Sequence, residues 1–172
     1  VVDANGDLCG TTKATNSAYG TIYKLPADGS AIVTLNSFIA AQGVGPNANL
    51  RIDPAGNIFG TIATGGLSNH GVVFEIPAGQ TNLIALASYG GNDGDQLGNG
   101  LVRDRAGDLF LLALPGTGGT GNGAILELPA GRSSLTTLAI FPAGVTPVGN
   151  LAIDSAGDLF AAAARPRHGA GA

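Results

Sequence analysis

The chain has 172 residues, of which 44% are hydrophobic and 12% charged, and its formal net charge is -4. This composition favours a folded globular protein over a disordered chain. The acidic balance and the absence of a long Lys or Arg cluster argue against nucleic acid as a partner, and no apolar run approaches the roughly 20 residues of a transmembrane helix.

The start of the chain indicates that something has been removed from it. There is no methionine at all, and no signal-like segment precedes the opening residues VVDANGDL. We therefore expect a processed product or a piece of a longer polypeptide. Cys9 is the one cysteine of the sequence, so an intrachain disulfide is excluded and the redox compartment stays open.

Two short phrases recur along the chain. The first, Asp-x-x-Gly followed by Asp or Asn, occurs at intervals of 50, 51 and 50 residues and begins at Asp3, Asp53, Asp104 and Asp154. The second, a strand that runs into Pro-Ala and a turn, occurs at intervals of 51 and 52 residues and begins at Gly20, Gly71 and Gly123. Two motifs with the same period define one structural unit of about fifty residues.

Each unit is predicted to hold four short strands. In the second unit these are Asn49 to Asp53, Asn57 to Ala63, Gly71 to Pro77 and Asn82 to Tyr89. The first two strands meet through the Asp-x-x-Gly turn, in which Asp caps the backbone and Gly accepts a positive φ. We assign this structural role to Asp53, Gly56, Asp104, Gly107, Asp154 and Gly157.

Four antiparallel strands every forty to fifty residues are typical of a β-propeller blade, whereas a sandwich does not repeat its turns at a fixed period. We predict an all-β β-propeller domain over residues 1–164, an irregular tail at 165–172, and blades at 1–38, 49–89, 100–141 and, in part, 149–164. These three and a half blades fall short of the roughly four to eight of a closed ring. We expect either the remainder of a longer propeller or a homo-oligomer of associating copies.

The phrases ASYGGNDGDQLGNGLVRDRAGDLF and NLRIDPAGNIFGTIATGGLSNHGVVFEI resemble the Gloeo_Verruco (GloVer) tandem repeat of bacterial exported proteins. GDLCGTTKATNSAYGTIYKL is similar to the same pattern, so the resemblance extends nearly to Arg165. It implies a propeller-like array located outside the bacterial cell or on its surface, and it supplies no catalytic residues. The strand and turn phrase is also similar to NHL-type and streptogramin lyase propellers, some of which are enzymes.

Glycine-rich connections at Lys13 to Gly20, Ala63 to Gly71 and Pro115 to Gly123 raise the question of phosphate binding. A phosphate loop opens a helix and usually carries a Lys-Ser/Thr pair. A strand follows each of these connections instead, so we interpret them as links between the second and third strands of a unit.

The turn DANGD places Asp3, Asn5 and Asp7 in the alternation of a calcium loop. The other copies of the turn lack the middle ligand, and none carries the downstream bidentate Glu. Turn capping is therefore favoured, and we predict no cofactor, with calcium as the alternative.

The connection GGNDGDQLGNG, Gly90 to Gly100, concentrates polar side chains between two units. In a propeller this connection and the glycine-rich connections emerge on one face, so we expect it to lie near His70. We call this surface the loop face and take it as the candidate site for a protein, a carbohydrate or calcium. Its candidate residues are His70, Asn92, Asp93, Asp95, Gln96 and Asn99.

No catalytic set stands out, since there are two histidines and no serine in a nucleophile elbow. We predict a non-enzymatic exported scaffold that binds or assembles through its loop face. Two alternatives stay open. One is a lyase or lactonase type of propeller enzyme with a metal near the central channel, whose mouth Asn49, Asn99 and Asn150 could ring. The other is a structural subunit of a larger surface assembly.

Overall fold

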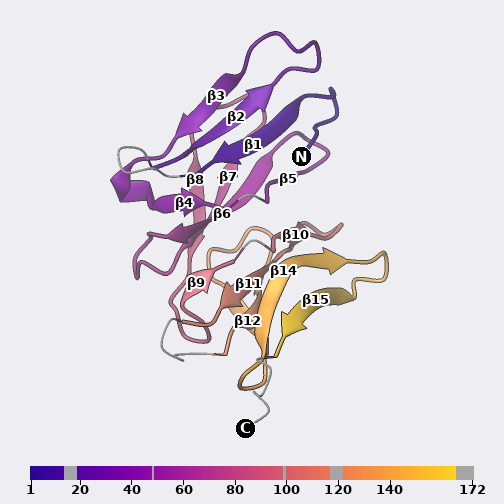
Figure 1. Cartoon of the computed structure of the whole chain (residues 1–172). Coiled ribbons are helices and arrows are strands. Elements are labelled where there is room, and N and C mark those ends of the chain that lie inside the picture. The colour runs from indigo at the N-terminus through magenta and orange to yellow at the C-terminus, as the bar shows by residue number, and fades with distance from the viewer. Residues whose placement is uncertain (14–18, 48, 99, 117–121, 166–172) are drawn as a thin grey trace, which may run out of the picture.

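The computed structural model describes residues 1–13, 19–47, 49–98, 100–116 and 122–165, and these residues form antiparallel β-sheets. The predicted all-β class is confirmed. The sheets follow one another in chain order from the N-terminal to the C-terminal end of the molecule (Figure 1). The described residues include one helical turn, the 3-10 segment η1 at Ala40–Gln42.

We number the four sheets along the chain. The first sheet has the order β1 (Leu8–Thr12), β2 (Thr21–Leu25), β3 (Val33–Ser37). The second comprises β4 (Val44–Pro46), β5 (Arg51–Ile52), β6 (Ile58–Thr64), β7 (Val72–Ile76) and β8 (Ile84–Ser88). The third comprises β9 (Gln96–Leu97), β10 (Val102–Arg103), β11 (Leu109–Leu114), β12 (Ala124–Leu128) and β13 (Thr136–Ile140). The fourth pairs β14 (Thr146–Ile153) with β15 (Leu159–Ala164).

The first strand of a unit begins earlier than predicted and is interrupted. β4 and β5 both pair with β6, and β9 and β10 both pair with β11. In the fourth sheet the same segment is one strand, β14, with a register shift between Val148 and Leu151. The sequence pattern hid these pairings because residues such as Pro46 suggest a loop, whereas proline is tolerated at a sheet edge.

The first sheet also differs from the prediction of four strands. Among the described residues it has three, preceded by an isolated bridge between Val2 and Leu8.

One hydrogen bond explains why the two sequence motifs keep the same period. The Asp or Asn that ends the first motif accepts, through Oδ1, the backbone N–H of the Ala in the Pro-Ala turn. The donor and acceptor pairs are Ala27 to Asp7 at 2.8 Å, Ala78 to Asn57 at 2.9 Å and Ala130 to Asp108 at 2.7 Å. The turn between the first two strands is thereby fixed to the turn between the last two.

The core lies between sheets, because successive residues of a strand point to opposite faces. In β6, Ile58 packs toward the first sheet and Phe59 toward the third. In β11, Leu111 packs toward the second sheet and Leu112 toward the fourth. The inner strands of the second and third sheets, β6, β7, β11 and β12, are therefore buried on both faces, as their apolar sequences require, whereas the last strands, β8 and β13, are more exposed.

Candidate ligand-binding groove

The first strands of three sheets meet at their edges. Asn49 Nδ2, before β5, donates a hydrogen bond to Oδ1 of Asn150 in β14, which lies 101 residues further along the chain. A side chain at Gly100 would come within 2.8 Å of the backbone nitrogen of Leu151. Asn49 and Asn150, two of the three asparagines that could ring a channel mouth, are thus in contact, and Asn99 falls outside the described residues.

An open groove of about 990 Å³ lies where these edges meet. It is lined by one segment from each of the second, third and fourth sheets, namely 51–54, 102–106 and 151–157. Each segment is the end of a first strand together with its Asp-x-x-Gly turn. The groove therefore lies at the Asp-x-x-Gly end of the sheets, whereas the predicted loop face is formed by other connections.

Three of the chain's eight lysines and arginines line this groove, and they are Arg51, Arg103 and Arg105. Each stands where the other units have an uncharged residue. Arg51 corresponds to Val102 and Ala152, Arg103 corresponds to Ile52 and Ile153, and Arg105 corresponds to Pro54 and Ser155. The charges are thus specific to single units, while the backbone that carries them is repeated.

Arg103 joins the second and third sheets. Its guanidinium lies over the ring of Phe59, 5.6 Å from the centroid, and its Nη2 is 3.9 Å from Asp53 Oδ2. Burial alone would raise the pKa of Asp53, but hydrogen bonds from the backbone and side chain of Asn57, aided by the Arg103 charge, lower that pKa. Asp53 is therefore ionised at neutral pH and partly neutralises Arg103.

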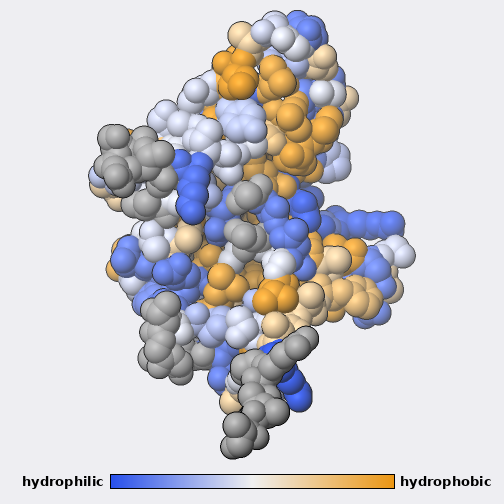
Figure 2. All heavy atoms as spheres, in the orientation of Figure 1, coloured by the Kyte–Doolittle hydropathy of each residue, from blue (hydrophilic) through white to orange (hydrophobic). Residues whose placement is uncertain are grey.

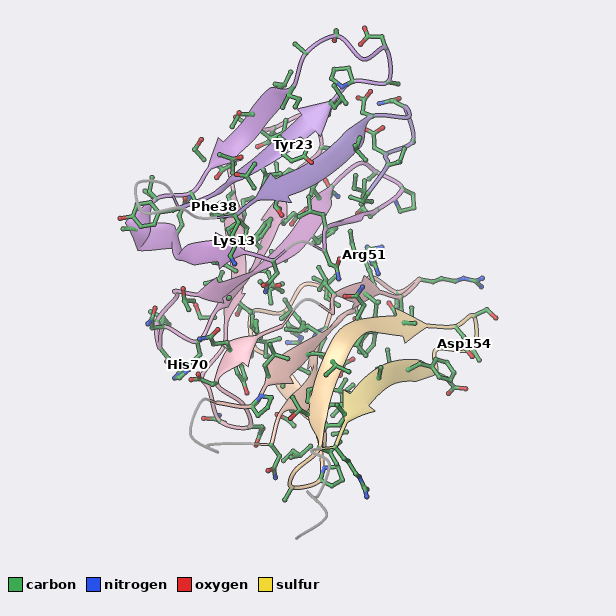
Figure 3. All side chains as sticks on the ribbon, in the orientation of Figure 1. Lys13, Tyr23, Phe38, Arg51, His70 and Asp154 are labelled. Carbon is green, nitrogen blue, oxygen red and sulfur yellow. The ribbon has the colours of Figure 1, made fainter. Side chains whose placement is uncertain are left out.

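The other two arginines of the groove differ from Arg103. Within the described part of the chain, neither Arg51 nor Arg105 forms a salt bridge. Arg51, labelled in Figure 3, is half-buried and Arg105 is exposed. The groove lining combines apolar strand residues with these two guanidinium groups and with Asp53, Asp104 and Asp154. Guanidinium groups bind a carboxylate, sulfate or phosphate through charge-assisted hydrogen bonds.

At the loop face, the structure brings His70 and Asp95 together. His70 Nδ1 donates to the Asp95 carbonyl at 2.5 Å and lies 3.3 Å from Asp95 Oδ1. The imidazole also packs on Gly91, where a side chain would come within 2.6 Å of His70 Cδ2. The connection 63–71, which carries His70, therefore meets the connection 90–100. Figure 3 labels His70, which lies beside the strand labelled β9 in Figure 1.

The other loop-face candidates have different surroundings. Asp93 holds the connection in place, since its Oδ2 accepts from Thr137 Oγ1 at 2.6 Å and its carbonyl accepts from Gly123 N at 3.0 Å. Gln96 lies in β9, Asn92 is exposed, and Asn99 is not among the described residues.

The weak metal candidates belong to a turn. Asp3 Oδ1 accepts from the backbone nitrogens of Asn5 and Asp7, each at 2.9 Å, and Asp7 forms an ion pair with Lys24. The hydrogen bond from Lys24, followed by that from Ala27, lowers the pKa of Asp7. In the described ranges no three His, Cys, Asp or Glu side chains are grouped to hold a metal ion.

The residues assigned to turns cap the backbone in the same manner. Asp53, Asp104 and Asp154 each accept, through Oδ1, the N–H four residues later at 2.8 to 2.9 Å. The glycine at the fourth position has a positive φ in each turn, namely 91° at Gly56, 100° at Gly107 and 95° at Gly157.

The repeat is also recognised by comparison with known families. The sequence profile of the Gloeobacter/Verrucomicrobia repeat matches residues 1–171. The chain belongs to this family. The suspected GloVer resemblance is thereby confirmed, and no curated protein matches this Gloeobacter/Verrucomicrobia repeat chain significantly.

The groove arginines of this Gloeobacter/Verrucomicrobia repeat chain are the candidate residues that sequence reasoning missed. A search for residues that all units share does not find Arg51, Arg103 and Arg105, because each differs from the residue at the same position in the other units. Alignment of the units would have found them as arginines at positions where the other units have an uncharged residue, two at the end of the first strand and one in the Asp-x-x-Gly turn. In the described part of the chain, no helix has the length and apolar character needed to cross a membrane.

Proposed function

We propose that this chain is part of an exported, non-enzymatic β-propeller scaffold that binds an anionic partner in the groove. The sheets are its blades, and their first strands face the central axis. Antiparallel sheets in chain order and the contact between Asn49 and Asn150 support this arrangement.

One observation carries the binding function: Arg51 and Arg105 come from different sheets, line one groove and have no salt bridge among the described residues. Its volume of about 990 Å³ lies at the upper end of the roughly 300–1,000 Å³ of ligand sites. The groove lining also holds Asp53, Asp104 and Asp154, so its three arginines are balanced in number by three carboxylates. What favours a partner with carboxylates is therefore the pair of guanidinium groups, Arg51 and Arg105, that have no salt bridge among the described residues.

The test compares a fluorescent hexaglutamate peptide with hexaglutamine by anisotropy at low salt. The wild-type chain is expected to bind hexaglutamate more tightly, and the double variant R51A/R105A should bind it about tenfold more weakly. Arg132, exposed and outside the groove, supplies the matched control R132A. Equal loss in R132A and the double variant, or no preference for hexaglutamate, would overturn the proposal.

The loop face is a second contact surface in this proposal, because His70 and Asp95 come together there from two connections. The variant H70A/D95A addresses it in the same assay. A loss of binding confined to this variant would move the site from the groove to the loop face.

A further inference from the structure

The first and fourth sheets each expose a face whose equivalent in the inner sheets is buried. In the second sheet, the opposed pairs Ile58–Ile76 and Gly60–Phe74 face the first sheet. The corresponding pairs in the first sheet are Leu8–Leu25 and Gly10–Tyr23. Because Cys9 and Ile22 point toward the second sheet, these pairs point away from it. We call this surface the N-terminal face.

The ring and glycine arrangement of the buried face is repeated on the N-terminal face. A side chain at Gly60 would lie 2.4 Å from Cζ of Phe74, and one at Gly10 would lie 2.6 Å from Cζ of Tyr23. An aromatic ring thus covers a glycine on the neighbouring strand in both sheets. Phe74 is fully buried under the first sheet, whereas Tyr23 keeps part of its surface in solvent.

Exposure follows the position of the sheet in the row. The first residue of the strand after the Asp-x-x-Gly turn is 7% exposed at Ile58 and 3% exposed at Leu109, but 42% exposed at Leu8. All three side chains are aliphatic and of similar size, and Leu8 is the one that no preceding sheet of the described residues covers. Figure 2 shows hydrophobic residues gathered over the part of the surface that the first sheet forms.

The opposite end has the matching face. The next strand position points toward the following sheet, and it holds Phe59 in the second sheet, Phe110 in the third and Phe160 in the fourth. Phe59 is buried among residues of the third sheet, including Leu109 and Leu128. Phe160 is 56% exposed, and Ala162 on the same face of β15 is also exposed. We call this surface the C-terminal face.

We propose that the N-terminal face docks against the C-terminal face of a second copy of this chain, head to tail. The three buried interfaces between the described sheets follow one rule. The face that bears Cys9, Phe59 or Phe110 packs against the face of the next sheet that bears Ile58, Leu109 or Leu159, respectively. The docked copies continue this series, with Phe160 packed on Leu8, Tyr23 and Leu25. The opposed pairs at the centre of both faces carry no charge, so no ion has to be desolvated.

A head-to-tail contact uses two different surfaces, and it leads to rings or filaments. This predicts how two blocked variants behave together. L8E loses its N-terminal face but keeps Phe160, and F160E loses its C-terminal face but keeps Leu8. Neither should assemble alone, while their mixture should form a dimer that cannot grow.

The experiment measures native mass by analytical ultracentrifugation over a wide range of concentration. The wild-type chain is expected to exceed the chain mass, each variant to match it, and the mixture to give twice the chain mass. Leu67, 96% exposed in a glycine-rich connection, supplies the control L67E, which should assemble as the wild type does. Circular dichroism checks folding, and A162E replaces F160E if the latter unfolds.

Three outcomes would overturn the inference. They are a monomeric wild-type chain at the highest concentration, assembly of L8E as in the wild type, and a mixture that stays monomeric. Assembly of F160E alone, with loss in L8E, would indicate a symmetric contact between two N-terminal faces and would equally refute the head-to-tail arrangement.

Discussion

Gly60→Ala is expected to destabilise the protein, whereas the same substitution at Gly10 is not. At Gly60 a new Cβ would lie 2.4 Å from Phe74 Cζ, 2.8 Å from its Cε1 and 3.0 Å from Leu50 Cδ2. Phe74 is fully buried, with its ring centroid 5.9 Å from that of Phe38, so it has nowhere to move. Overpacking of this kind costs about 1–3 kcal/mol.

The alanine also removes the backbone entropy penalty of a strand glycine, about 0.5–1 kcal/mol. The difference between the two ranges is a net loss for G60A of about 0–2.5 kcal/mol, centred at about 1 kcal/mol, which corresponds to a fall in Tm of up to roughly 10 °C for a chain of this size. At Gly10 the clash is with Tyr23, which is half-exposed and can swing into solvent. G10A should lie within about 1 kcal/mol of the wild type, on the stabilising side.

Urea unfolding followed by circular dichroism, at the lowest protein concentration that the signal allows, measures both variants. Because the two sites share the strand position and the clash distance, each controls for the other. Equal destabilisation of G60A and G10A would refute the reasoning, since it would mean that burial of the ring makes no difference.

Three further predictions concern single contacts. D108A should lose about 1 kcal/mol of stability, because Asp108 Oδ1 accepts a hydrogen bond from Ala130 N. D108N should keep this stability, because Asn57 accepts the equivalent hydrogen bond in the second unit. Urea unfolding in which D108N is as unstable as D108A would contradict this. The lowered pKa of Asp7 predicts stability that is present above the ordinary pKa of 3.8 and is lost as pH falls through the folded value. K24Q should reduce the fall in Tm that accompanies acidification. If the fall in Tm is unchanged in K24Q, the ion pair of Lys24 with Asp7 is not its cause. Cys9 is 2% exposed and burial raises its thiol pKa, so a thiol reagent should label it at the rate of opening, and immediate labelling of the native protein would count against this burial.

The sequence predicts those features that depend on local chemistry. Asp at the first turn position and Gly at the fourth determine the bend, which recurs in the structure with a positive φ at Gly56, Gly107 and Gly157. The strands between the turns follow because β-branched and aromatic residues are bounded by Pro and Gly. Hydrophobic pattern and turn chemistry thus sufficed for the all-β class.

Other features depend on partners that the sequence does not name. Pairing of Val44 and Pro46 with β6 follows from the sheet edge available to them, and the local residues suggest a loop. Arg51 and Arg105 come from different sheets, so their groove is defined by which strand ends converge. The sequence predicted that His70 lies near the connection 90–100, because both connections were expected to emerge on one face, but it did not predict the particular contact with Asp95.

The apolar faces of the sheets are repeated from unit to unit, whereas the arginines of the first strands and their turns are not. Across the row of sheets, the units repeat the same apolar strand positions, which join neighbouring sheets within the chain and which we propose to join two copies. Along the first strands, Arg51, Arg103 and Arg105 occupy positions that are uncharged in the other units, and there the surface differs from unit to unit. In the two proposals made above, assembly depends on what the units share and ligand binding on how they differ. A substitution at Leu8 or Phe160 should change assembly without changing ligand binding, and a substitution at Arg51 should change ligand binding without changing assembly.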